Sequence, residues 1–91
     1  MDAQQPWRPR LAPRARLKFD AIAQQQMLLF PEATLLLNET GAAIVRLCDG
    51  ARSIEEIVDG LAAQFRGVDR ATLRCEVDAF LESIRARGLV Q

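Results

Sequence analysis

Two short segments of the chain place apolar side chains on both faces of a predicted strand. Residues 33–37 read Ala-Thr-Leu-Leu-Leu, and residues 25–30 read Gln-Gln-Met-Leu-Leu-Phe. Successive side chains of a strand point to opposite faces, so consecutive leucines cannot all lie on one face. The sheet must therefore carry more apolar surface than a few helices can cover. This surplus indicates a binding partner.

The preceding residues complete a small antiparallel sheet. Over residues 15–20, Leu17 and Phe19 alternate with Arg16 and Lys18, which is typical of a half-buried strand. Pro31 supplies a turn between residues 25–30 and 33–37, because proline presets the φ angle of the first turn position. We expect three strands, with residues 33–37 at an exposed edge.

Three helices follow, and each has a capping residue and an apolar stripe. The predicted caps are Asn38 or Thr40, then Ser53 in a capping box with Glu56, and finally Asp69. The stripes run over residues 43–48, 54–65 and 73–84 at three-and-four spacing. Gly50, Gly67 and Gly88 interrupt or end these helices, and we expect Leu89 and Val90 to fold back onto the core.

The order of elements predicts an α+β fold that is winged helix-turn-helix-like, with a small three-stranded antiparallel sheet followed by three helices. A chain of 91 residues is one domain by length. Prolines at positions 6, 9 and 13 make residues 1–13 an irregular N-terminal arm, and residues 14–91 form the domain. We expect Trp7 to dock on the domain rather than on a partner.

The composition argues against an enzyme, a metal site and a cofactor. The chain has no histidine and no tyrosine, so the commonest general base and metal ligand are missing. No glycine-rich phosphate loop follows a strand. Cys48 and Cys75 stand at unrelated spacing, and we expect each to fill core space on a helix. The chain is therefore predicted to catalyse nothing and to hold no cofactor or metal.

Charge disfavours a nucleic-acid partner. Twelve basic and twelve acidic residues cancel, and over residues 69–87 four arginines are matched by four carboxylates. A DNA-binding winged helix stays open as an alternative, as does a structural oligomerisation module. Residues 1–5 lack a basic signal-peptide start, and no apolar run approaches the roughly 20 residues that span a bilayer. We expect a cytoplasmic protein that does not bind membranes.

Several of these segments, in this order and spacing, are shared with one family. They are Leu-Leu-Leu-Asn-Glu-Thr-Gly at residues 35–41, Ile44, Asp49-Gly50, residues 53–58, residues 78–81 and Gly-Leu-Val at residues 88–90. The chain resembles the PqqD family over about residues 14–91. The resemblance implies a peptide chaperone of pyrroloquinoline quinone biosynthesis, of the kind called a RiPP precursor peptide recognition element. Such a protein would bind the precursor peptide PqqA and present it to the radical SAM enzyme PqqE, which crosslinks a Glu and a Tyr of the peptide.

The apolar surplus and the resemblance together predict that a peptide adds a strand to the edge of residues 33–37 and packs against the third helix. Without the resemblance, these leucines would be assigned to an ordinary core. The same edge could pair with a second copy, so a homodimer is a further hypothesis. The expected peptide-binding residues lie on the third strand and the third helix: Thr34, Leu35, Leu36, Leu37, Arg74, Asp78, Leu81 and Arg85.

Overall fold

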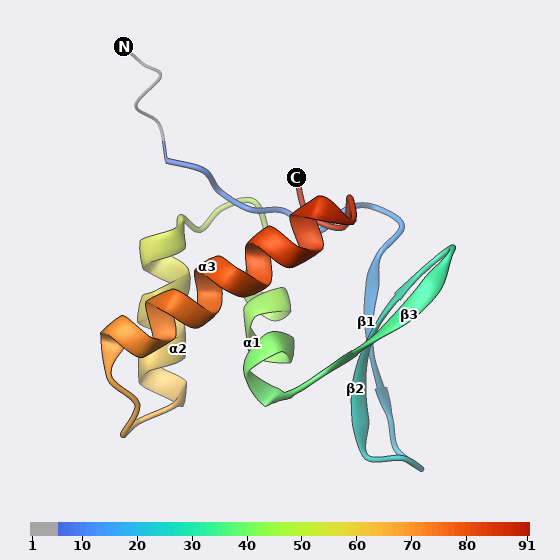
Figure 1. Cartoon of the computed structure of the whole chain (residues 1–91), viewed down its shortest axis with the longest axis horizontal. Helices are drawn as coiled ribbons and strands as arrows, with labels where there is room; N and C mark the ends of the chain where they lie inside the picture. The colour runs from blue at the N-terminus through green and yellow to red at the C-terminus, as the bar shows by residue number, and fades with distance from the viewer. Residues whose placement is uncertain (1–5) are drawn as a thin grey trace.

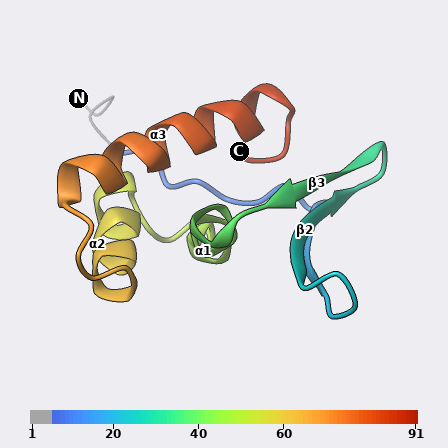
Figure 2. The same cartoon turned by 60° about the horizontal axis from the view of Figure 1, so that its bottom comes forward.

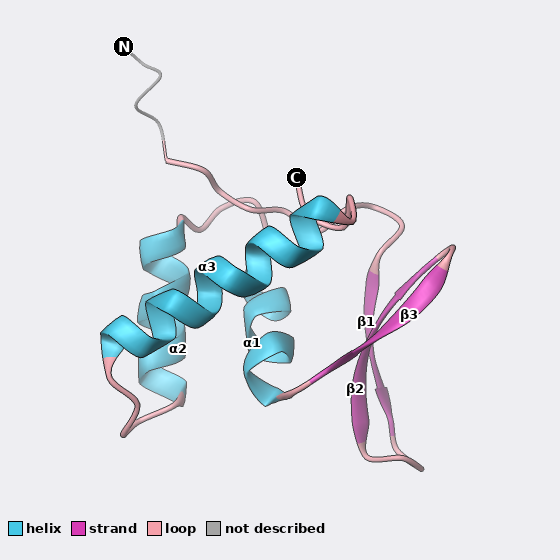
Figure 3. Cartoon of the chain, viewed as in Figure 1, coloured by secondary structure: helices cyan, strands magenta, loops and turns pink. Residues whose placement is uncertain are grey.

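The computed structural model describes residues 6–91 and contains three strands followed by three helices (Figures 1 and 3). The strands are β1 (Arg16–Asp20), β2 (Gln25–Phe30) and β3 (Ala33–Leu37). The helices are α1 (Glu39–Leu47), α2 (Ile54–Gln64) and α3 (Arg70–Ala86). The predicted fold class and order of elements are confirmed. The sheet stands to one side of the helices, and α3 crosses in front of α1 and α2 in the view of Figure 1.

The sheet has the order β1-β2-β3, and both pairings are antiparallel. Leu28 pairs with Leu17 on one side and with Leu35 on the other, and it is fully buried, so this row marks the inner face. The next row, which contains Leu36, must point to the opposite face. The side chain of Leu36 is 65 % exposed. Apolar side chains therefore do occupy both faces, as the sequence predicts.

The predicted helix caps are present. The Asn38 side chain accepts a hydrogen bond from the Gly41 backbone N–H at 2.7 Å, so Asn38 rather than Thr40 caps α1. Ser53 and Glu56 form the reciprocal capping box of α2, and Asp69 caps α3. Each cap satisfies a backbone donor that the first helical turn leaves free.

The apolar stripes of the helices meet the inner face of the sheet in one core. Leu89 and Val90 are each only 4 % exposed, which confirms that the chain folds back after α3. Cys48 lies in this core, but Cys75 is exposed on α3, so the expectation that both thiols fill core space is wrong for Cys75. The largest fully buried side chains of the described residues come from the arm, β2 and all three helices: Pro9, Leu28, Ile44, Ile57, Val58, Leu61, Leu73, Val77, Leu81 and Ile84.

The described part of the N-terminal arm, residues 6–13, is tied to the C-terminal end of the chain. Arg10 and Gln91 exchange two backbone hydrogen bonds of 3.2 and 2.8 Å, and the Pro9 carbonyl accepts from the Gly50 N–H at 2.9 Å. The Trp7 indole donates to the Gln91 carbonyl at 2.9 Å, which confirms that this ring docks on its own domain. The predictions made for residues 1–5 lie outside the described residues.

Candidate functional site

The third strand has an open edge. Within the described residues, β3 pairs with β2 alone, and its backbone makes no hydrogen bond to another element on the side away from β2. Alternate N–H and C=O groups of such an edge point outward and can accept another strand. In the view of Figure 2, β3 lies between α3 and β2.

The other edge of the sheet, β1, is protected by its side chains. Arg16, Lys18 and Asp20 alternate along β1, and charged side chains on an edge strand discourage pairing with a further strand. β3 has no charged residue, and its sequence is Ala-Thr-Leu-Leu-Leu. Of the two edges, β3 is therefore the one suited to strand addition.

A cavity lies at the end of β3 next to the turn between β2 and β3. It has a volume of about 330 Å³, and we call it the hairpin-end cavity. Phe30, Pro31 and Glu32 form its hairpin side, Arg87 and Leu89 from the chain after α3 form the opposite side, and residues 12–15 before β1 complete the lining. The fold-back of the chain after α3 thus builds one end of the candidate site.

A second cavity lies just beyond the other end of β3, where α1 begins. It measures about 370 Å³, and we call it the helix-end cavity. Its lining includes Gly41 and Ile44 from α1 and Glu76, Ala79 and Phe80 from α3. A Cβ at Gly41 would stand 3.2 Å from Cε1 of Phe80, so glycine at this position lets the Phe80 ring lie close to the start of α1.

The helical spacing divides α3 into three faces. Residues 73, 77, 81 and 84 face the core, and Leu81 is accordingly only 1 % exposed. Glu76, Phe80 and Arg87 recur at intervals of four and seven, which places them on one further face, and all three line the cavities at the ends of β3. Arg74, Asp78 and Arg85 lie about half a turn around the helix from that face.

The structure therefore brings together only part of the predicted site. Thr34, Leu35, Leu36 and Leu37 do form the edge strand, with Leu37 buried, Leu35 half-buried and the other two exposed. Arg74, Asp78 and Arg85 instead border α2 and the N-terminal arm, and Leu81 belongs to the core. The residues beside the ends of β3 are Glu76, Ala79 and Phe80 of α3 and Arg87, which follows α3. The sequence interpretation did not select them. The four-residue spacing of Glu76 and Phe80 could have indicated from sequence that they share one face of the helix.

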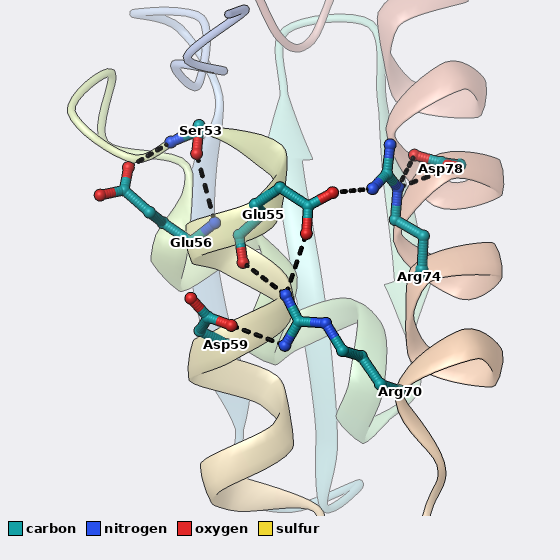
Figure 4. Close-up of polar contacts among 7 residues, drawn as sticks. All are labelled: Ser53, Glu55, Glu56, Asp59, Arg70, Arg74 and Asp78. Atoms are coloured by element: carbon teal, nitrogen blue, oxygen red, sulfur yellow. Dashed lines mark hydrogen bonds and ion pairs between the residues drawn. The ribbon is translucent and has the colours of Figure 1, made fainter.

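An ion-pair cluster explains where Arg74 and Asp78 point (Figure 4). Arg74 contacts both Asp78, at 3.2 Å, and Glu55 of α2. Arg70 joins Glu55 and Asp59 at 2.9 and 2.6 Å. The hydrogen bond from Arg70 and the positive charge of Arg74 lower the pKa of Glu55 below its ordinary value. These arginines are matched by carboxylates that hold α2 to α3, which argues against a role in binding nucleic-acid phosphates.

Arg85 contacts the N-terminal arm. Its guanidinium carbon lies 4.7 Å from the centre of the Trp7 ring, within the range of a cation–π contact. Arg8 of the same arm is 3.1 Å from the Glu56 carboxylate at the start of α2. These contacts place Trp7 and Arg8 beside α3 and α2, about half a turn around α3 from Glu76 and Phe80.

Neither a reactive thiol at Cys48 nor a cluster of metal ligands is present among the described residues. Burial, reinforced by the negative charge of Asp49, raises the pKa of the Cys48 thiol to about 12, so it stays protonated and unreactive at neutral pH. Among residues 6–91, no group of three Cys, Asp or Glu side chains is arranged to hold a metal ion. The same residues include no helix that is both long and apolar enough to cross a bilayer.

Comparison with known proteins places the chain in a family. The model of the family described as Coenzyme PQQ synthesis protein D (PqqD) matches residues 25–90. A PqqA binding protein of Rhodopseudomonas palustris (strain TIE-1) is 40% identical over 83 residues, which cover 91% of this chain and 80% of that protein. A PqqA binding protein of Methylococcus capsulatus is 35% identical over 81 residues, which cover 89% of this chain and 84% of that protein.

Solved structures show the same fold. The NMR structure of the PqqD truncation of Methylobacterium extorquens PqqCD, a stand-alone RiPP recognition element, superposes with a TM-score of 0.78. It is 24% identical, and the match covers 100% of this chain and 99% of that one. TbiB1 in complex with the TbiA(beta) leader peptide matches with a TM-score of 0.74 and 23% identity, over 90% of this chain and 94% of that one. With the family model and the curated relatives in agreement, the chain belongs to the PqqD family.

Proposed function

We propose that this chain binds a PqqA precursor peptide along the edge of β3 and catalyses no reaction itself. The observation that carries the proposal is the unprotected edge of β3, which runs between two cavities, one lined by α3 and the other by the chain that follows α3. The relatives that are 35 and 40% identical are named PqqA binding proteins. A leader peptide is bound to TbiB1, which has the same fold.

Strand addition explains how one small surface can hold a flexible peptide in register. The peptide backbone would form ladder hydrogen bonds with β3, and every second side chain would point inward. Five residues of strand span about 17 Å, so side chains four to six positions apart would reach the two cavities. Phe80 and Ala79 would contact an apolar side chain in the helix-end cavity.

Charge distinguishes the two ends of the site. The hairpin-end cavity is bordered by Arg14 and Arg87 with one opposing carboxylate, Glu32. The helix-end cavity is bordered by Glu76 alone among charged residues. An acidic side chain of the peptide would therefore be favoured at the hairpin end, and a carboxylate near Glu76 would be disfavoured.

The expected affinity is moderate. Each buried apolar anchor contributes about 1.5 to 3 kcal/mol, whereas association costs at least about 4 kcal/mol before the peptide is ordered. Two or three anchors plus ladder hydrogen bonds then give a dissociation constant near micromolar. This affinity suits a carrier that presents its cargo to PqqE in the cytoplasm and then releases it.

A second copy of the chain would compete for the same edge. Two β3 strands could pair with each other, which would cover the edge in a homodimer. Light scattering over a dilution series, with and without peptide, tests this arrangement. A dimer that dissociates as peptide is added would show that both partners use β3.

Calorimetry with synthetic PqqA tests the function itself. A proline placed in the segment that pairs with β3 removes a ladder donor, so its binding should be lost, whereas proline outside that segment should leave the affinity unchanged. Undiminished affinity at every proline position would argue against strand addition. No detectable binding of unmodified PqqA would refute the proposed function.

A further inference from the structure

The outer face of the sheet, which points away from the helices, is an apolar surface with a basic border. Its side chains form two rows across the strands: Lys18, Met27 and Leu36 in one, and Arg16, Leu29 and Thr34 in the other. Leu36 is 65 % exposed, and Met27 and Leu29 are partly exposed. Large apolar side chains grouped on an exposed face mark an interaction surface more often than isolated ones do. We call these six residues the outer-face patch.

The charges of this patch lie on one side. Arg16 and Lys18 are exposed on β1, and no carboxylate of the described residues lies within ion-pair distance of either. Asp20 also points to this face, but its carboxylate accepts the Ile22 and Ala23 backbone N–H groups at 3.0 and 3.2 Å in the turn after β1. The apolar centre is thus bordered along β1 by cations that lack a described partner.

A peptide added to β3 would enlarge the same face. Its outward side chains would stand next to Leu36 and Thr34 and become the fourth members of the two rows. The loaded sheet would present cations on β1, apolar residues on β2 and β3, and then the peptide. A protein docked there would contact the carrier and the bound peptide together.

We propose that the outer-face patch is the docking surface for the enzyme that modifies the bound peptide. To match the patch, the enzyme surface needs an apolar centre and carboxylates that meet Arg16 and Lys18. This inference rests on the proposed function, since it is the peptide that completes the surface. It also separates the two tasks of a carrier: the edge of β3 holds the peptide, and the outer face of the same sheet meets the enzyme.

A second copy of the chain fits this patch less well than an acidic partner does. In a two-fold dimer the same patch meets itself, so the cations of both β1 strands are brought to one interface without added carboxylates. Like charges placed together at an interface oppose association, whereas carboxylates facing Arg16 and Lys18 favour it. The charge of the patch therefore selects a partner of opposite sign.

The test measures the affinity of purified PqqE for the chain, alone and saturated with PqqA. Lys18→Glu reverses a patch charge on β1, which two strands separate from the peptide. Arg66→Glu is its matched control on the loop after α2. Leu36→Ser removes the exposed leucine, and Val68→Ser is its control, because Val68 is 42 % exposed outside the sheet. Calorimetry with PqqA is run on every variant.

We expect PqqE to bind the loaded chain more tightly than the free chain, and each patch variant to lower that affinity about tenfold or more. The two controls should stay within about twofold of the unmodified chain. Unchanged PqqE affinity in either patch variant overturns the proposal, as does failure of PqqE to bind the loaded chain. A stable dimer that Leu36→Ser disrupts would assign the patch to self-association instead. If the unmodified chain does not bind PqqA in calorimetry, the proposed function is refuted. This outcome is distinct from any change in the affinity for PqqE.

Discussion

Replacing Phe80 with alanine should weaken peptide binding more than it weakens the fold. Phe80 is half-buried on α3, where its ring lies against the start of α1 and lines the helix-end cavity. A half-buried phenylalanine leaves on the order of 50 Å² for a ligand, and the ligand buries a similar area in return. At about 25 cal/mol per Å², the roughly 100 Å² lost corresponds to about 2.5 kcal/mol, or about 70-fold in affinity.

The bound peptide can shift to fill part of the space left by the ring, which reduces the lost binding energy. We therefore expect the affinity for PqqA to fall about ten- to seventyfold when the peptide is titrated into the variant. Phe65→Ala is the matched control, because Phe65 is also half-buried but lines a different cavity, beside Arg46 and Gln64. Both variants should lose stability in chemical denaturation, since each removes part of a ring from the edge of the core. Equal effects of the two variants on PqqA affinity would refute the placement of the peptide beside Phe80.

Three further outcomes follow from the structure. Arg87→Glu should lower the affinity for PqqA about three- to tenfold and reduce its dependence on salt, whereas Arg66→Glu should change neither. Calorimetry at two ionic strengths measures both effects. Equal behaviour of the two variants would contradict the placement of the peptide beside Arg87. The pKa of Glu55 is lowered from its ordinary value of 4.5, so its ion pairs contribute stability above that value, and this contribution is lost as the pH falls through the lower folded pKa. Denaturation curves should therefore be level between pH 5 and 7 and decline in more acidic buffer; a decline already between pH 7 and 5.5 contradicts this assignment. Because burial raises the pKa of Cys48 to about 12, a thiol reagent at pH 8 should modify the folded chain at Cys75 alone, and mass spectrometry finding two adducts would disprove the burial of Cys48.

The helix starts and the apolar pattern of the strands could be predicted from sequence, because residues within a few positions of the chain determine them. Ser53 and Asp69 mark helix starts by satisfying free backbone donors nearby, and both predictions are confirmed. For α1 the sequence left Asn38 and Thr40 open, and the structure selects Asn38. The three consecutive leucines of β3 indicated apolar side chains on both faces, which the exposure of Leu36 confirms. These features depend on neighbours within a few positions of the chain.

The face of α3 that turns toward the ends of β3 could not be predicted in the same way. Arg74, Asp78 and Glu76 are all exposed on one helix, and the choice between them depends on where α2 and the arm lie. Glu55 of α2 forms an ion pair with Arg74. The Trp7 ring, 78 residues earlier in the chain, forms a cation–π contact with Arg85. Such contacts between distant segments leave no local pattern. The same is true of the bond between the Trp7 indole and Gln91.

Amide hydrogen exchange of β3 tests the central claim most directly. In the free chain, the outward N–H groups of residues 33–37 face solvent, and every second one should exchange rapidly. Saturation with PqqA should protect these alternate amides, while the outward amides of β1, at the opposite edge, should continue to exchange as before. Unchanged exchange along β3 in a chain that binds PqqA would show that the peptide does not add a strand there.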